Sequence, residues 1–231
     1  MTPIAQKVKD IKQSFRQMMD GATAQSMRQK GLDYRLNWGA TLPRLREMAE
    51  ALKAEYSLAE TAEALKAGQS DVQSPDDHSA VYHLAIALWK EDVRECKLLA
   101  TMLMPPDEAL PEVIDLWMEQ TTSIEVTEQA AMNLYQHLPF AADKAFQWLA
   151  SADDLTQLCG YHVLSRLFMR QQEPNERGIN EFLDQAVTAL QSPNVSLRKA
   201  TMQSIIRFSE LGLVYERMAK SATKQAGFDF L

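Results

Sequence analysis

The sequence predicts an all-α fold in which antiparallel helix pairs stack into a curved solenoid. Three features of the 231-residue chain indicate this fold. Apolar residues recur with the 3.6-residue period of a helix, no stretch sustains the period-two alternation of a strand, and a short polar turn recurs along the chain. We therefore expect helices in most of the chain and no sheet.

Apolar stripes place the individual helices. The clearest stripe runs from Ile179 to Leu190, with apolar residues at i, i+3, i+4, i+7, i+8 and i+11. Shorter stripes of the same kind lie within Cys96–Leu103, Val163–Phe168 and Met202–Ile206. Prolines stand at or between the ends of these segments, where a missing N–H is best tolerated. They are Pro43, Pro75, Pro105, Pro106, Pro111, Pro139, Pro174 and Pro193.

Short polar turns separate the predicted helices at regular intervals. They lie near residues 91, 121, 152 and 193. Their spacing of about 30 to 40 residues is the length of one helix-turn-helix unit in HEAT or armadillo arrays. Because one such unit cannot bury its own apolar stripe, we expect a single repeat domain of this type over residues 1–231. The polar stretch Gln69–Asp77 is predicted to be a connector within it.

Composition and motifs exclude several functional classes. The longest apolar run, Leu84–Trp89, is far shorter than the roughly 20 residues of a membrane span, and the N-terminus does not resemble a signal peptide. The chain has no glycine-rich phosphate-binding motif and no metal-binding histidine pair, and a catalytic role for His162 is not expected. Cys96 and Cys159 are expected to be buried thiols. These features predict a cytoplasmic monomer without cofactor, metal or membrane contact.

The charge is unevenly distributed along the chain. Residues 1–54 carry 10 Lys and Arg against 5 Asp and Glu, residues 55–160 carry 5 against 19, and residues 161–231 carry 9 against 7. A DNA-binding surface needs clustered cations that displace the counterions of phosphates. The two ends of the sequence are therefore the candidates for DNA contact, while the acidic middle either solvates an outer face or attracts a basic partner.

Two segments carry a family resemblance. They read NWGATLPRLREMA from Asn37 to Ala49 and ALWKEDVRECKLLA from Ala87 to Ala100. Both resemble segments of the DNA alkylation repair family, the AlkD-type HEAT-like DNA glycosylases. The resemblance extends from about residue 30 to about residue 210 of the sequence.

The resemblance implies a function on DNA. Members of the family bind DNA on the concave face of the solenoid and excise positively charged N-alkylated bases. A carboxylate stabilises the sugar cation that develops, tryptophans lie beside the lesion, and an arginine contacts the backbone. When the family pattern Trp-Asp-x-Val-Asp-x-x-Ala is placed on Val126 and Ala130, the catalytic aspartate falls on Thr127 and the tryptophan on Ser123. The resemblance therefore implies that the catalytic aspartate is replaced in this chain.

Two neighbouring carboxylates are candidates for the missing one. Glu125 and Glu128 lie two residues before and one residue after Thr127. On a helix, shifts of one and two residues rotate a side chain by about 100° and 200° around the axis, so neither glutamate shares the face of Thr127.

Cations and aromatic residues provide the candidate DNA contacts. Arg94 with Lys97, and Arg198 with Lys199, follow predicted turns and would line one edge of the array as phosphate contacts. Trp38 and Trp117 are the candidate aromatic residues beside DNA. Because tryptophans at the ends of helices often fill core gaps instead, a structural role is an open alternative for both.

Two functional hypotheses follow from the sequence. The first is an AlkD-like HEAT-repeat protein that binds DNA, with N-alkylbase glycosylase activity weak, altered or lost. The second is a noncatalytic scaffold that binds a protein partner on the concave face, and it explains the acidic middle better.

Overall fold

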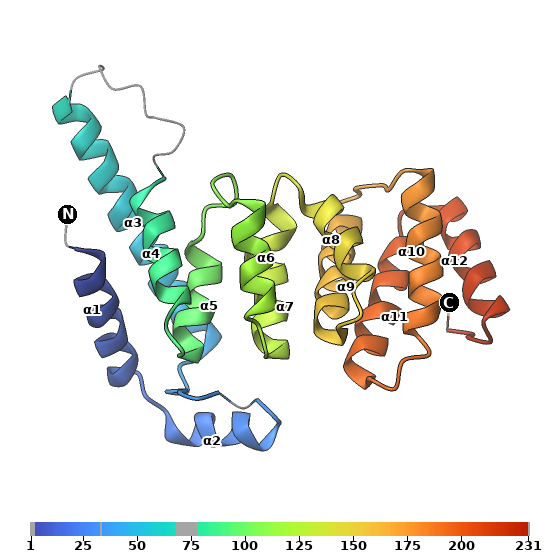
Figure 1. Ribbon diagram of the computed structural model, residues 1–231, viewed down its shortest axis with the longest axis horizontal. Coiled ribbons are helices and arrows are strands. Elements are labelled where there is room, and N and C mark those ends of the chain that lie inside the picture. Colours follow the sequence, from blue (N-terminus) through green and yellow to red (C-terminus); the bar gives the residue numbers. More distant parts are fainter. Residues whose placement is uncertain (1–2, 33, 68–77, 231) are drawn as a thin grey trace. The chain divides into compact units, whose positions relative to one another are not determined.

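The computed structural model describes residues 3–32, 34–67 and 78–230, and its regular elements are helices joined by short turns (Figure 1). No strand occurs among these residues, so the predicted all-α class is confirmed. The predicted connector Gln69–Asp77 lies outside the described residues. No helix in the described part of the chain is long and apolar enough to cross a membrane.

The chain divides into two compact units, Met1–Ala130 and Ala131–Leu231. In a repeat array each helix pair contacts mainly its neighbours, so this division does not bear on the prediction of one repeat domain. The helices of unit 1 are α1 (Ile4–Gln17), α2 (Gly21–Gln29), α3 (Leu42–Ala67), α4 (Ala80–Trp89), α5 (Arg94–Leu103), α6 (Pro111–Glu119) and most of α7 (Ile124–Asn133). Those of unit 2 are η1 (Tyr135–His137), α8 (Ala141–Leu149), α9 (Asp154–Met169), α10 (Glu176–Ala189), α11 (Val195–Ser209) and α12 (Leu213–Gln225).

Helix α5 is the central helix of unit 1. It packs against α3 and α4, and α1 packs against α4. Every residue of α5 except Lys97 is buried, including the charged pair Arg94 and Glu95 at its start. Because a buried charge is stable only when it is paired and hydrogen-bonded, these two residues must find their partners inside the unit.

Helix α9 is the central helix of unit 2. It packs against α8 and α11, and α10 and α12 pack against α11. A Cβ atom on Gly160 would lie 2.9 Å from the backbone oxygen of Ala145, so the glycine permits the close approach of α8 and α9. Phe168, Phe182 and Phe208 join their rings into one cluster in this core.

Residues 90–93, 120–123, 150–153 and 190–194 connect α4 to α5, α6 to α7, α8 to α9, and α10 to α11. In unit 2, side chains at three helix starts accept hydrogen bonds from free backbone N–H groups, which stabilises the first turn. They are Asp153, Asn175 and Asn194. Both cysteines, Cys96 and Cys159, are buried, as predicted.

Candidate functional site

A small pocket opens at the end of unit 1 where α4 and α6 end and α5 and α7 begin. We call this region, together with residues 30–32 and 34–41, the turn end of unit 1. The pocket has a volume of ≈ 200 Å³. Its lining is polar and aromatic and consists of Tyr34, Trp89, Asp92, Val93, Arg94, Lys97, Gln120, Thr121, Thr122, Ser123 and Val126.

An ion pair between Arg94 and Glu125 forms the inner side of this pocket. The Nε and Nη2 atoms of Arg94 donate to the two oxygens of Glu125 at 2.8 and 2.5 Å. The hydroxyl of Tyr34 donates to Glu125 Oε2 at 2.7 Å and lies 2.6 Å from Ser123 Oγ. Burial lowers the pKa of Arg94, but the hydrogen bonds and charge of Glu125 outweigh burial and raise it. Arg94 is therefore held as a cation, and Glu125 accepts three hydrogen bonds.

Glu95 extends this network into the backbone. Its carboxylate accepts hydrogen bonds from the backbone N–H groups of Trp38 at 3.3 Å and Ala40 at 3.2 Å. Arg94 Nη1 donates to the Ala40 carbonyl at 2.9 Å and to Glu95 at 3.3 Å. Both charged side chains at the start of α5, Arg94 and Glu95, are thus hydrogen-bonded to the backbone of residues 38–40.

The arrangement limits what Glu125 can do chemically. A carboxylate that stabilises a developing sugar cation must keep its negative charge directed at the reacting atom. Here Arg94 neutralises that charge, and both oxygens of Glu125 already accept hydrogen bonds from Arg94 and Tyr34. Glu125 has the geometry of a structural residue.

The position to which the resemblance assigns the catalytic aspartate, Thr127, is buried and hydrogen-bonded at the start of α7. Thr127 has 0% exposure, and its hydroxyl donates to the backbone oxygen of Ser123 at 3.1 Å. Glu128 lies exposed on α7, and burial of part of its side chain, with the nearby charge of Glu125, raises the pKa of its carboxyl.

Trp89 forms another wall of the pocket and stacks on Trp117 behind it. The rings of Trp89 and Trp117 lie 4.2 Å apart and nearly parallel. Lys97 Nζ lies 4.4 Å from the centre of the Trp89 ring and donates to the Trp89 backbone oxygen at 2.6 Å. Burial lowers the pKa of Lys97, and the charge of Asp92 opposes that effect. Gln120 accepts a hydrogen bond from Trp89 Nε1 at 2.8 Å.

The four predicted phosphate contacts have different environments in the structure. Arg94 is buried, with 1% exposure, and pairs with Glu95 beside it and with Glu125 on α7, so it is not the surface cation that the sequence predicts. Lys97 is half-buried and lines the pocket. In unit 2, Arg198 donates to the Ser192 carbonyl, whereas Lys199 is exposed. Lys97 and Lys199 remain candidate phosphate contacts.

Both predicted aromatic residues lie in the core. Trp38 is 6% exposed and lies 5.9 Å from the ring of Phe15, while Trp117 is 2% exposed and stacked on Trp89. Neither ring is open as a platform for a base, so the structural alternative describes their position.

Sequence reasoning missed Tyr34 and Glu95. Tyr34 meets Ser123 and Glu125 across 89 and 91 positions of the sequence, so no local pattern marks it. Glu95 had a usable signal, because an acid beside an arginine at the start of a strongly apolar helix must be paired inside the fold. The sequence gives that requirement but not the partners.

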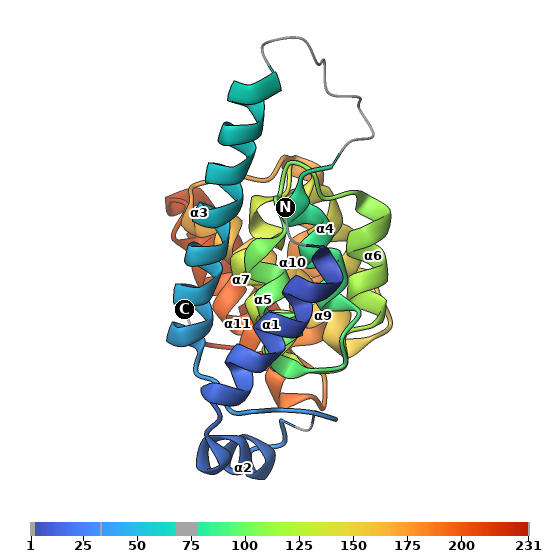
Figure 2. The ribbon, with the colours of Figure 1, turned by 90° about the vertical axis from the view of Figure 1, so that its left-hand side faces the viewer.

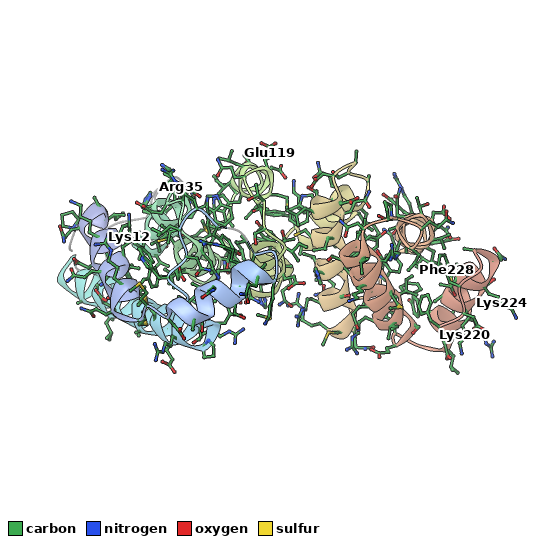
Figure 3. The ribbon with its side chains drawn as sticks, turned by 90° about the horizontal axis from the view of Figure 1, so that it is seen from below. Lys12, Arg35, Glu119, Lys220, Lys224 and Phe228 are labelled. Atoms are coloured by element: carbon green, nitrogen blue, oxygen red, sulfur yellow. The ribbon has the colours of Figure 1, made fainter. Side chains whose placement is uncertain are left out.

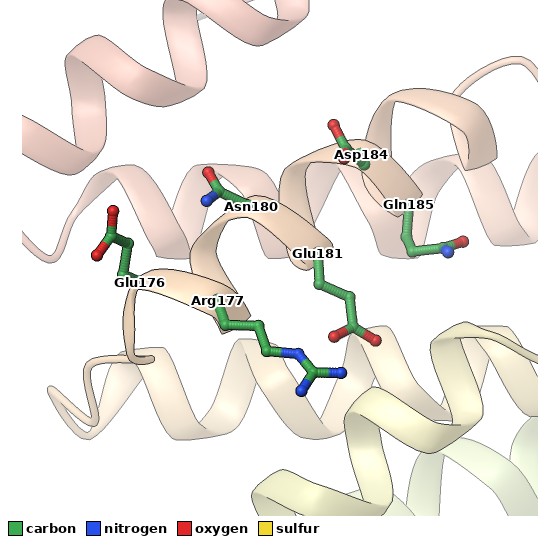
Figure 4. Close-up of a pocket in the computed structure, with 6 residues that line it drawn as sticks. All are labelled: Glu176, Arg177, Asn180, Glu181, Asp184 and Gln185. Carbon is green, nitrogen blue, oxygen red and sulfur yellow. The ribbon is translucent and has the colours of Figure 1, made fainter.

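Unit 2 has a polar groove on α10 that does not suit DNA. It has a volume of ≈ 590 Å³ and is lined from one helix by Glu176, Arg177, Asn180, Glu181, Asp184 and Gln185 (Figure 4). Arg177 and Glu181 extend to the same side of the helix. Three carboxylates against one guanidinium would repel phosphate.

His162, on α9, gives a prediction for the pH dependence of stability. Burial, with a smaller contribution from the charge of Arg166, lowers the pKa of His162 from 6.5 to about 4. Between these values the unfolded chain binds more protons than the folded one, so the free energy of unfolding should fall as pH drops from about 6.5 to about 4. Urea unfolding at several pH values should show that the free energy of unfolding falls less with pH for His162→Gln than for the unmodified chain. The exposed His83 provides the control, and equal slopes for His162→Gln and His83→Gln would contradict the expectation.

Among the residues that the structure describes, no group of three or more His, Cys, Asp or Glu side chains is placed to hold a metal ion. The turn end is instead a network of fixed charges, hydroxyls and aromatic rings. Together with the stacked helix pairs, these features define a helical-repeat protein with a polar site where its turns meet.

Comparison with known proteins gives the family. A model of the family described as DNA alkylation repair enzyme matches residues 11–210, and the chain belongs to this family. A solved structure shares the fold with a TM-score of 0.71 and 14% identity, over 94% of this chain and 82% of its own. That protein is from a family described as related to the HEAT-like repeat DNA glycosylases and as having affinity for branched DNA structures. The predicted HEAT-like class is thereby confirmed. No curated protein matches the chain.

Proposed function

We propose that this chain is a DNA-binding member of the DNA alkylation repair family in which excision of N-alkylated bases is weak, altered or lost. One observation carries the proposal. At the position that the family resemblance assigns to the catalytic aspartate stands a buried threonine, Thr127, and the nearest upstream carboxylate, Glu125, is neutralised by Arg94. Neither Thr127 nor Glu125 can therefore serve as the free carboxylate that the resemblance implies for base excision.

The charge of the turn end supports DNA binding. Lys12 and Arg35 each pair with one acid of the α4–α5 turn, Glu91 at 2.7 Å and Asp92 at 3.5 Å. Beyond these pairs, the turn end and the adjoining ends of α2 and α3 carry the cations Arg28, Lys30, Arg44, Lys90 and Lys97 against the acids Asp20 and Glu119. The starts of α5 and α7 also line the pocket, and helix N-termini favour phosphate.

Binding should depend on salt and on DNA form. The similar solved structure belongs to a family with affinity for branched DNA, which makes a four-way junction the first substrate to test beside a duplex of the same sequence. Fluorescence anisotropy at several salt concentrations should give affinity that falls as salt rises, since released counterions drive the association. Negligible affinity at low salt for both forms would overturn the proposal.

Excision should be tested on DNA that contains 7-methylguanine. We expect little or no release of the base by the unmodified chain, and Glu125→Gln should leave any release unchanged because Glu125 is already neutralised. If release occurs and is lost in Glu128→Gln, then Glu128 supplies the missing carboxylate and activity is altered, not lost. Release that both substitutions leave intact would rule out both glutamates.

A protein-binding scaffold is the second candidate function. It is favoured by the acidic residues between 55 and 160, of which Glu112, Glu119 and Asp143 are exposed. A pull-down from cell extract that returns nucleic acid without a protein partner would count against it.

A further inference from the structure

Helix α2 contributes no buried side chain to the fold. The structure describes all nine of its residues, and each is exposed or half-exposed. Most helices in globular proteins are held by an apolar face, and an isolated helix of this length is marginal in water. Its order must therefore come from contacts at its ends.

The N-terminal end of α2 is fixed to the network around α5. The Asp20 backbone N–H donates to the Trp38 carbonyl at 2.9 Å, and the Asp20 carboxylate caps the helix by accepting from the Thr23 N–H at 3.1 Å. Residue 38 is in turn bonded to Glu95. Near the other end, Asn37 donates to the sulfur of Met27 at 3.4 Å. Helix α2 is thus held in place yet left open to solvent.

One face of α2 forms an open groove. Its lining residues are Gly21, Ala24, Gln25, Arg28 and Gln29, and the groove has a volume of ≈ 450 Å³. These positions are i, i+3, i+4, i+7 and i+8, which is a single helical stripe. Two small residues permit close approach of another molecule, and the other three side chains are hydrogen-bond donors.

The surroundings of the stripe favour a negatively charged partner. Between Asp20, whose carboxylate caps the helix, and Asp33, the segment has no acidic residue and carries Arg28 and Lys30, although the whole chain has a net charge of −7. In Figures 1 and 2, α2 lies at the lower end of unit 1, beyond the ends of α1 and α3. Figure 3 views the molecule from below, with α2 toward the viewer and Arg35 labelled. The helix therefore lies at the periphery of unit 1, where another molecule can reach it.

We propose that α2 is a DNA-contacting helix whose stripe lies in a major groove, with Arg28 on phosphate or guanine and with Gln25 and Gln29 on base edges. A helix fits the major groove, and glutamine and arginine are the side chains that pair with adenine and guanine there. This inference rests on the proposed function, and it assigns the contact to a helix apart from the pocket.

The chain contains its own matched control. Gln25–Gln29 reads QSMRQ, and Gln13–Gln17 on α1 reads QSFRQ. Both segments expose two glutamines and an arginine at the same spacing. On α1, however, the segment belongs to a helix that buries Val8, Ile11 and Phe15 in the core. The two segments differ in position and packing but hardly in composition.

Anisotropy titrations with a fluorescent four-way junction and a matching duplex test the proposal. Replacing Gln25, Arg28 and Gln29 together with alanine should weaken binding of at least one form about tenfold or more. The same triple replacement of Gln13, Arg16 and Gln17 should weaken it less than about threefold. In Arg28→Ala alone, the slope of the logarithm of the binding constant against the logarithm of the salt concentration should decrease in magnitude by about one. All of these positions are exposed, so circular dichroism should show an unchanged fold.

Each other outcome is decisive. If the unmodified chain binds and the α2 triple variant binds equally well, the role of α2 is wrong while DNA binding stands. If both triple variants weaken binding equally, the removed charges contribute to DNA binding regardless of the helix that carries them, and the role of α2 is again wrong. If the unmodified chain does not bind, both the proposed function and this inference fail.

Discussion

Replacing Arg94 with methionine is expected to lower the free energy of unfolding by about 3 to 5 kcal/mol, because it leaves two carboxylates without their buried partner. The side chains of Glu95 and Glu125 are 0% and 13% exposed. Neither can recover hydration without opening the start of α5. Urea unfolding followed by tryptophan fluorescence measures the loss, since Trp38, Trp89 and Trp117 all lie in unit 1.

Two comparisons isolate the effect of the buried ion pair. Arg35→Met removes an exposed pair, with side chains 82% and 66% exposed, and should change stability little. Combining Arg94→Met with Glu125→Leu should recover part of the loss, because removing both partners leaves fewer unpaired charges. A loss below about 1 kcal/mol for Arg94→Met would show that water reaches the ion pair and that Glu125 is not held as described.

Replacing Gly39 with alanine is expected to detach α2. Gly39 has φ +77°, and a Cβ atom there would lie 2.2 Å from the backbone oxygen of Asp20 and 2.9 Å from the backbone nitrogen of Ala24. Backbone atoms cannot move aside as a flexible side chain can. We expect a loss of more than about 3 kcal/mol in the stability of unit 1, or separation of α2 from residues 37–40. Hydrogen exchange of the α2 amides measures that separation directly.

Gly31 distinguishes the steric clash from backbone strain. It has φ +83° but no atom within 4 Å of its Cβ position. Gly31→Ala should therefore show only the strain of a left-handed alanine, about 1 to 2 kcal/mol, and leave α2 protected from exchange. Equal effects at the two positions would mean that the contact between Gly39 and Asp20 does not hold the helix.

The sequence predicts the fold better than the site because the two depend on different distances along the chain. Helical periodicity and proline placement are local, and they suffice for the all-α class and for stripes such as Ile179–Leu190. Interactions at the site join positions far apart, such as Tyr34 with Ser123 and Arg94 with Glu125. Arg94 follows a turn and reads as a surface cation. Its burial depends on which acids the tertiary fold brings beside it, and periodicity does not encode that.

The bonds of Glu95 have a consequence for how family members are recognised. The two segments that carry the resemblance, Asn37–Ala49 and Ala87–Ala100, are hydrogen-bonded to each other through Glu95, Arg94, Trp38 and Ala40. They are the two halves of one structural joint, and Thr127 is not part of it. A resemblance based on these two segments therefore reports the packing of unit 1, and it does not report which residues act in catalysis.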